Sequence, residues 1–295
     1  MRQLLACTIA FTLALLASPP AGAQTSAAPA AGPPAADGDG PDEVPALWTA
    51  GLFAVAAHHA VYPGAARRSS NATLLPFVTY RGPIVRLEGG SAGLRALRTP
   101  RTELDFSAAA SFGSDGLDTG ARAGMPAIGT LAEIGPSLRI NLGELPEDGQ
   151  RSPWRLDLPL RAVFDADRDF DYVGMSFEPR LSWRLPPIGD WTPSLHAGAL
   201  FGSRALNEMY YGVDPVYVTP TRPAYAAKPG LVATRLGMSW SKPIDTDLRL
   251  GLHASIESVR GGANESSPLV GRVVDPILAI TLTWTAFRSE QPGVK

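Results

Sequence analysis

The stretch WRLDLPLRAVFD, Trp154 to Asp165, alternates between two kinds of side chain along its whole length. Successive side chains of an extended strand point to opposite faces, so a period of two predicts a β-strand with one apolar and one charged face. The apolar set consists of Trp154, Leu156, Leu158, Leu160, Ala162 and Phe164. The other set includes Arg155, Asp157, Arg161 and Asp165.

The same period recurs along the chain, whereas helical spacing is rare. It is clear in Val173 to Leu185, in Leu248 to Ser258 and in Leu278 to Trp284. Most of the later segments have the length that a tilted strand needs to cross a bilayer. About twelve strands are predicted, at residues 46–57, 73–80, 84–88, 91–98, 102–112, 130–142, 154–165, 172–185, 191–202, 230–241, 247–259 and 273–287.

Loop lengths distinguish a soluble sandwich from a membrane-spanning barrel, two folds whose strands both alternate apolar and polar side chains. Most odd-numbered connections are long, such as residues 203–229, and the even-numbered ones are short, such as residues 186–190; Gly89-Gly90 is an exception. Outer-membrane barrels alternate long external loops with tight periplasmic turns in this way. The loop lengths therefore favour a barrel with both termini in the periplasm.

The aromatic and charged residues point to the same fold. If the first strand rises from the periplasm, all six tryptophans lie at periplasmic strand ends, and Phe112, Phe164 and Phe201 lie at the opposite ends. Aromatic girdles at headgroup level and an outward phase without charge are what lipid contact requires. We therefore expect an all-β fold, a closed antiparallel transmembrane β-barrel of about 12 strands. In the alternative, a soluble sandwich, the polar phase would face solvent.

Four prolines conflict with this prediction. Pro136, Pro159, Pro179 and Pro193 lie inside predicted strands, where each removes a backbone donor from a sheet that has no free edge. Bulges or local register errors are the expected explanation.

The N-terminal residues have the features of a secretory signal: Arg2, an apolar run from Leu4 to Ala17, and small residues up to Ala23. The next residues are rich in Ala, Pro and Gly and have little to bury, which predicts disorder. The predicted organisation is a cleaved signal peptide at 1–23, a tether at 24–45, a barrel at 46–287 and a C-terminal tail at 288–295. Export together with a barrel predicts a Gram-negative outer membrane, whose lipid is the first expected partner.

Composition excludes several kinds of chemistry. The single cysteine, Cys7, lies in the signal, so the mature chain has no disulfide, thiol nucleophile or thiolate metal site. A formal net charge of −2 and the lack of a basic cluster argue against nucleic acid. His58-His59 does not predict a metal site, because adjacent side chains on a strand point apart. No cofactor and no metal are predicted.

Two groups of residues are candidates for contact with a solute or a partner. The expected interior charges are Arg155, Arg161, Glu178, Arg180 and Arg235. The longest loop contains Tyr210, Tyr211, Tyr217 and Tyr225. Clustered tyrosines can form a partner surface or pack over the mouth of the barrel, and both interpretations stay open.

One motif suggests catalysis. His253-Ala254-Ser255 with Glu257 is similar to the His-x-Ser pair that outer-membrane phospholipases and lipid A deacylases carry on the lipid-facing side of a strand. Here the polar phase lies opposite Leu252, which places His253 and Ser255 in the interior. A polar interior lining is the better interpretation. We therefore predict no catalytic residues and no enzyme.

Several short motifs occur in the order seen in one family. They are Tyr62-Pro63-Gly64, Pro76-Phe77-x-x-Tyr80-Arg81-Gly82, Tyr210-Tyr211-Gly212-Val213, Pro223-Ala224-Tyr225 with Gly230-Leu231, and Ser267-Pro268-Leu269-Val270. In this set the chain resembles the MipA/OmpV family over nearly the whole predicted barrel. It departs from the family at Ala65-Ala66, where Ser-Asp is common, and in continuing past Phe287, where barrels commonly end.

The resemblance implies an outer-membrane barrel without catalytic residues. It implies a scaffold that joins a lytic transglycosylase to a penicillin-binding protein during murein growth. Partner contact is expected at the periplasmic turns, chiefly Gly143 to Ser152, and at the tether. The alternative is a narrow porin-like channel or an antibiotic-responsive protein; a lipid hydrolase using His253 and Ser255 is least favoured.

Overall fold

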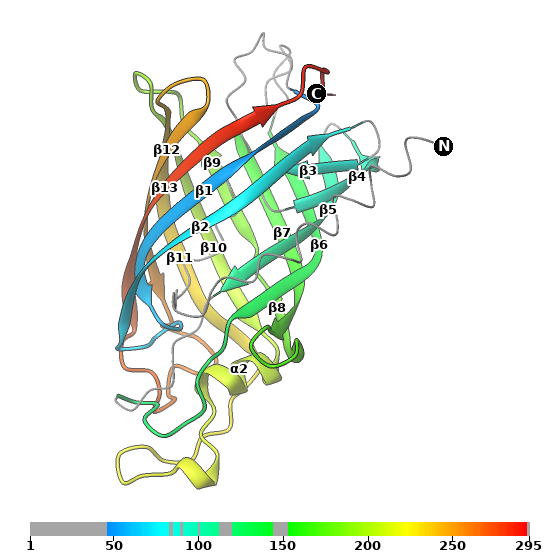
Figure 1. Cartoon of the computed structure of the whole chain (residues 1–295). Helices are drawn as coiled ribbons and strands as arrows, with labels where there is room; N and C mark the ends of the chain where they lie inside the picture. The colour runs from blue at the N-terminus through cyan, green and yellow to red at the C-terminus, as the bar shows by residue number, and fades with distance from the viewer. Residues whose placement is uncertain are drawn as a thin grey trace.

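The computed structural model describes residues 46–82, 85–88, 91–99, 101–111, 120–143 and 153–293. In them thirteen strands form one antiparallel sheet that wraps into a barrel (Figure 1). The strands are β1 (Trp48–Ala60), β2 (Arg68–Arg81), β3 (Val85–Glu88), β4 (Ser91–Arg98), β5 (Thr102–Ser111), β6 (Leu131–Leu142), β7 (Trp154–Asp165), β8 (Asp171–Phe177), β9 (Arg180–Arg184), β10 (Thr192–Gly202), β11 (Gly230–Pro243), β12 (Leu248–Ser258) and β13 (Val274–Arg288).

The first and last strands of the sheet pair with each other. Apart from β8 and β9, each strand pairs with the next along the chain, and β13 also pairs with β1 over a long register from Thr49↔Arg288 to His58↔Leu278. β2 and β3 pair only at Tyr80↔Leu87 and Arg81↔Arg86. Pairing of the first strand with the last satisfies backbone groups that a flat sheet would leave at its edges. The predicted all-β antiparallel fold is confirmed.

The predicted strand at 172–185 is divided in two. β8 and β9 are separated at Glu178-Pro179, and both pair with β7 and β10. Proline cannot donate to the ladder, but its carbonyl still accepts, from the Ala199 N–H at 3.1 Å. The strand therefore breaks at Pro179 while the sheet continues.

The bulge explanation is wrong for the other three prolines. Pro136, Pro159 and Pro193 are paired in register with Phe106, Ser137 and Trp240. The register shifts lie elsewhere, at Ala50/Gly51, Gly93/Arg98, Val163/Phe164 and Leu200/Phe201. Loss of a single donor is tolerated at these prolines without an extra residue in the strand.

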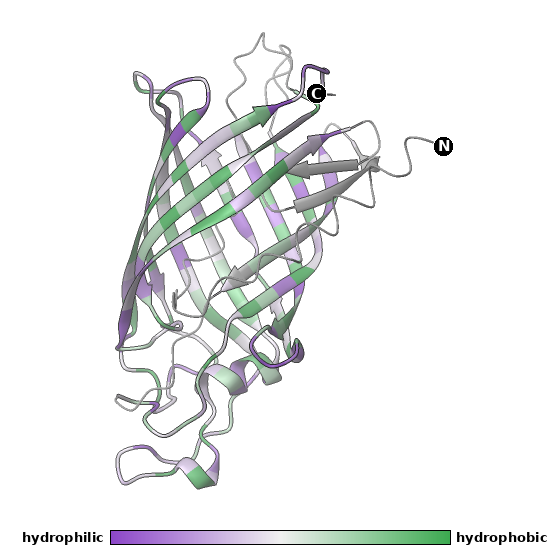
Figure 2. Cartoon of the chain, in the orientation of Figure 1, coloured by the Kyte–Doolittle hydropathy of each residue, from purple (hydrophilic) through white to green (hydrophobic). Residues whose placement is uncertain are grey.

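Burial alternates along the strands as the sequence predicted, and hydropathy alternates with it (Figure 2). On β13 the side chains of Asp275, Ile277 and Ala279 are buried, whereas Leu278 and Ile280 are each 55% exposed on the outward face. Four tryptophans are also substantially exposed on this face, namely Trp48, Trp154, Trp183 and Trp284. Large exposed apolar side chains on a complete strand face suit contact with lipid rather than water.

A bulge in β8, opposite Val163 and Phe164 of β7, changes one predicted orientation. The alternation that begins at Val173 predicts that this residue shares the outward face with Met175, but it packs against the interior cluster of Leu131, Val163 and Leu206. The shift at Val163/Phe164 pairs Phe164 with Tyr172, whose ring contacts it edge-on at 5.9 Å. The bulge therefore turns Val173 inward while Tyr172 and Met175 stay exposed on the outward face.

The described parts of the long loops fold into an ordered cap at the end opposite the start of β1 and the end of β13 (Figure 1). Residues 203–229, expected as a loop, contain the helix α2 (Arg204–Tyr211) and the 3₁₀ helix η1 (Pro215–Tyr217). Ser203 caps α2, and its Oγ accepts from the Leu206 N–H. No helix in the described residues is long and apolar enough to cross a membrane.

The C-terminal residues return to the first strand. The Ser289 N–H donates to the Trp48 carbonyl at 2.9 Å and the Leu47 N–H donates to Gln291 at 2.8 Å. The predicted signal peptide and tether, and residues 144–152 of the predicted contact turn, lie outside the described residues.

Candidate functional site

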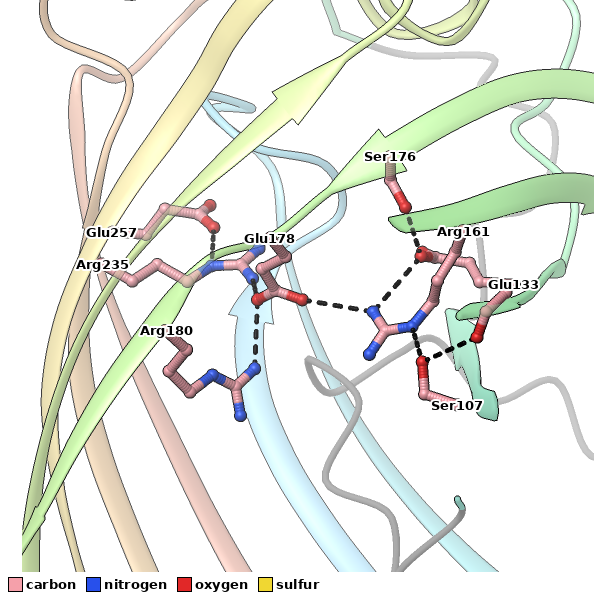
Figure 3. Close-up of polar contacts among 9 residues, drawn as sticks. Ser107, Glu133, Arg161, Ser176, Glu178, Arg180, Arg235 and Glu257 are labelled. Atoms are coloured by element: carbon pink, nitrogen blue, oxygen red, sulfur yellow. Dashed lines mark hydrogen bonds and ion pairs between the residues drawn. The ribbon is translucent and has the colours of Figure 1, made fainter. Parts of the chain in front are cut away.

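Glu178 is the centre of an ion-pair network on the inner face (Figure 3). Its Oε1 accepts from Arg235 at 2.7 Å and from Arg180 at 3.1 Å, and its Oε2 lies 3.5 Å from Arg161 Nη1. Arg235 in turn donates from Nε to Glu257 at 2.7 Å. The break at Pro179 lets the chain place Glu178 where guanidinium groups from β7, β9 and β11 converge.

Arg161 extends the network toward β5 and β6. Its Nε donates to Ser107 Oγ at 2.9 Å, and its Nη1 lies 3.7 Å from Glu133. Glu133 also accepts from Ser176 at 2.8 Å. We call the set Ser107, Glu133, Arg161, Ser176, Glu178, Arg180, Arg235 and Glu257 the Glu178 network (Figure 3).

A second set of charges lies on the inner faces of β5, β6 and β7. Arg139 contacts Glu103, Asp105 and Asp157 at 3.5, 3.2 and 3.2 Å, and Asp157 also accepts from Arg155 at 3.0 Å. We call these five residues the Arg139 network. Arg155 was predicted as an interior charge, whereas Arg139, Glu103 and Asp105 were not, although their places in the polar phase of adjacent strands could have suggested them.

The two networks bring together all five predicted interior charges and pair them. The Glu178 network contains three carboxylates and three guanidiniums, which balance. Ion pairs and hydrogen bonds within the chain offset the desolvation of these charges. A solute that bound them would therefore have to displace an existing partner. The arrangement fills the inner face with contacts of the chain to itself.

The candidate hydrolase residues lie on the inner face. Glu257 is engaged by Arg235, and the His253 ring stacks on His196 at 4.8 Å and 11°. Ser255 is buried on the same phase as Glu257. The prediction that this motif faces away from lipid agrees with these positions, and His253 and Glu257 make contacts other than those of a catalytic dyad.

The tyrosines of the cap differ in exposure. Tyr211 is 1% exposed; its hydroxyl donates to the Pro63 carbonyl at 2.9 Å and its carbonyl accepts from Ser267 at 2.7 Å. Tyr210 packs at 6.4 Å on Tyr62, whose hydroxyl donates to Leu269. These contacts match the packing interpretation of Tyr210 and Tyr211.

The other two candidate tyrosines are partly buried at the loop junctions. Tyr217 and Tyr225 pack against the cluster of Met125, Val213 and Leu269. The Tyr225 hydroxyl lies 3.4 Å from both Asn264 and Ser266. Contact of these tyrosines with a partner stays a prediction.

Two arginines that the sequence analysis missed tie the cap together. Arg122 donates to the carbonyls of Met209, Tyr210 and Pro126, each at 3.1 Å. Arg222 donates to Tyr217, Ala121 and Ala123 at 2.7 to 2.9 Å. Each arginine binds carbonyls on two segments distant in sequence, which is how its fork of donors stabilises loops.

Burial changes the acidity of the tyrosine cluster. Burial raises the pKa of Tyr62 to about 12, against a smaller opposing effect of Arg122, and also raises the pKa values of Tyr210 and Tyr211. Burial lowers the pKa of Arg122, which lies 5.8 Å above the Tyr62 ring.

The buried phenols predict a loss of stability in alkali. Unfolded tyrosine ionises near pH 10, before folded Tyr62, so the stabilisation is complete below about pH 10 and is lost as pH rises toward 12. The expected loss is about 1.4 kcal/mol per pH unit for each buried tyrosine in that window. Ultraviolet titration of tyrosinate is expected to show a late-ionising group that Tyr62→Phe removes. Ionisation of every tyrosine near pH 10 would contradict the packed cap.

The wrapped sheet of amphipathic strands, its apolar outward face and its charged inner face define an outer-membrane β-barrel protein. The model of the family described as "MltA-interacting protein MipA" matches residues 51–286. The chain therefore belongs to the MipA family, as its motifs suggested.

The chain also has low similarity to several solved structures. A NanC porin has 9% identity and a TM-score of 0.39, covering 79% of this chain and 99% of its own. A bacterial polysaccharide outer membrane secretin has 10% identity and a TM-score of 0.36, covering 81% and 99%. The outer membrane phospholipase A from Escherichia coli has 12% identity and a TM-score of 0.30, covering 84% and 95%. No curated protein matches, and likenesses this low indicate nothing about activity.

Proposed function

We propose that this barrel is a non-enzymatic outer-membrane scaffold that holds a lytic transglycosylase and a penicillin-binding protein together, and that it acts at its periplasmic end. The observation that carries the proposal is the pairing of the interior charges with one another in the Glu178 and Arg139 networks. An inner face occupied by ion pairs leaves the ends of the barrel as the surfaces on which a partner can act.

Membership of the MipA family supports the identity of one partner. The family's description names an interaction with MltA, and the resemblance associates MltA with lytic transglycosylase activity. The start of β1 and the end of β13 lie at one end of the barrel, which supports the site of contact (Figure 1). A tether that precedes β1 and the turn that follows Gly143 would both extend from the barrel toward the murein.

Affinity capture tests this surface assignment. The full chain in mild detergent is expected to retain both classes of murein enzyme. A variant with the turn at 143–152 shortened and residues 24–45 deleted is expected to lose most of that capture, because both proposed contact segments are altered. Neither change touches the interior ion pairs, so the barrel is expected to stay folded. Shortening of the loop at 166–170 between β7 and β8, at the opposite end, is the control. Equal capture by all three proteins would count against the proposed surface.

A narrow channel is the second candidate function. Its support is that the side chains of Arg155 and Arg180 are 38% and 39% exposed, so part of each guanidinium can still meet a small polar solute or an antibiotic. A barrel of this size can nevertheless be filled by long interior side chains. Ion conduction distinguishes the channel from the scaffold.

A further inference from the structure

We infer that the outward face of the barrel carries a specific site for a phosphorylated, acylated glycolipid of the outer leaflet. A depression of about 640 Å³ lies over β1, β2, β11, β12 and β13. Its walls come from two rows of outward side chains that neighbour each other across the strand pairs. One row includes Ala72, Ala56, Ile280 and Leu252, and the other includes His58, Leu278 and Ala254.

Small side chains make the depression. Ala56 lies between Ala72 and Ile280 on neighbouring strands, and Ala254 lies beside Leu278. The row between the two walls consists of inward-facing residues, including Ala57 and Ala279, whose backbone forms the floor. Five adjacent strands, at about 4.8 Å each, give a slanting groove roughly 20 Å long. Its apolar walls and length suit an acyl chain that lies along the sheet.

One end of the groove is polar and lies near the loops. His58 Nδ1 is 2.7 Å from Ser70 Oγ, and Arg68 Nε donates to His58 Nε2 at 2.8 Å. These three residues are at the ends of β1 and β2 that lie opposite the termini. With the termini in the periplasm, this end of the groove lies at the headgroups of the outer leaflet.

The charge at this end suits an anion. Arg68 forms an ion pair with Asp275, and Arg272 approaches the same carboxylate at 3.8 Å with its side chain 49% exposed. Two guanidiniums therefore share one carboxylate, which leaves one positive charge beside the groove. A phosphate is a favoured partner for guanidinium because it accepts several short, charge-assisted hydrogen bonds.

The apolar groove suits an acyl chain, and the excess positive charge at its end suits a phosphate. A lipid that contains both groups therefore fits the whole site. Outer-leaflet glycolipid supplies both at this depth, so the occupant assigned is a phosphorylated glycolipid of the lipid A type. A neutral lipid would use only the groove, and a soluble phosphate would use only the arginines. The inference is independent of the proposed scaffold role, since it concerns the lipid-facing surface and not the periplasmic end.

Native mass spectrometry of the full chain in detergent, titrated with hexa-acylated, doubly phosphorylated lipid A, tests the site. One lipid per barrel is expected, with affinity about tenfold weaker for the dephosphorylated lipid, which loses a charge-assisted contact. Arg68→Gln is expected to remove that preference. Ala56→Leu with Ala72→Leu fills the groove and is expected to weaken both lipids about tenfold. Ala162→Leu, on the outward face of β7, is the matched control and is expected to bind as the unaltered protein does.

Two results would overturn the assignment. Equal binding by the groove-filled variant and the Ala162→Leu control would show that the depression holds no chain. Equal binding of phosphatidylglycerol and lipid A would show a general anionic-lipid surface in place of a glycolipid site. Unfolding midpoints in urea, measured on every variant, separate loss of the site from loss of the fold.

Discussion

Replacing Glu178 by glutamine is expected to lower the free energy of unfolding by about 3–5 kcal/mol, the usual cost of removing one partner from a buried ion pair. Glu178 is 8% exposed and contacts the guanidiniums of Arg161, Arg180 and Arg235. The amide keeps the shape of the side chain but removes its charge. Three guanidiniums would then share two carboxylates, which leaves one excess positive charge in a poorly solvated interior.

Urea unfolding in lipid vesicles, followed by tryptophan fluorescence, measures this loss. Arg155→Gln is the matched control, because the Arg155 side chain is 38% exposed and pairs with Asp157 near solvent. Its expected cost is below about 1 kcal/mol, as is usual for a screened pair. Equal losses in the two variants would mean that Glu178 is not the centre of the interior network.

Replacing Tyr211 by alanine is expected to open the loop cap while the strands stay paired. Tyr211 is the largest side chain among the fully buried residues of the described chain. Removing an aromatic side chain from a packed site costs about 3–5 kcal/mol. The lost contacts are the hydrogen bond from the Tyr211 hydroxyl to Pro63 and the packing of its ring against Tyr62 and Tyr210, so the destabilisation falls on the cap.

Proteolysis from the outer side of reconstituted vesicles detects this opening. A local cost of that size corresponds to cleavage of the loops faster by about two to four orders of magnitude, if opening is rapid and reversible. Tyr211→Phe keeps the ring and loses only the hydrogen bond to Pro63, so its loops are expected to be cleaved only slightly faster than those of the unaltered protein. If Tyr211→Ala resisted protease as the unaltered protein does, the cap would not depend on this side chain.

Strand positions could be predicted from the sequence because outward side chains face lipid and inward side chains carry the charges. This arrangement imposes a period of two on apolar and polar residues along each strand. The predicted strand 154–165 coincides with β7, and 91–98 coincides with β4. Val173 was misplaced because a bulge adds a residue without changing the composition of either phase. The break at Pro179 had a visible cause, since proline removes a ladder donor.

The contacts between distant residues could not be predicted in the same way. That Glu178 would meet Arg161, Arg180 and Arg235 depends on the register of strands that are far apart in sequence. The helix α2 was missed because the loop was interpreted from its tyrosines, although Ser203 before the helix and Gly212 after it are capping residues that could have indicated it. The ordered cap follows from Arg122 and Arg222, whose carbonyl partners have no sequence signature.

The central claim is that this barrel acts from its ends and not through its interior. Planar-bilayer recording on the unaltered full chain tests it most directly. The ion-paired interior predicts no resolved conductance steps. Stable steps whose size or ion selectivity changed when Arg161 or Arg235 was replaced by glutamine would contradict the claim and identify the protein as a channel.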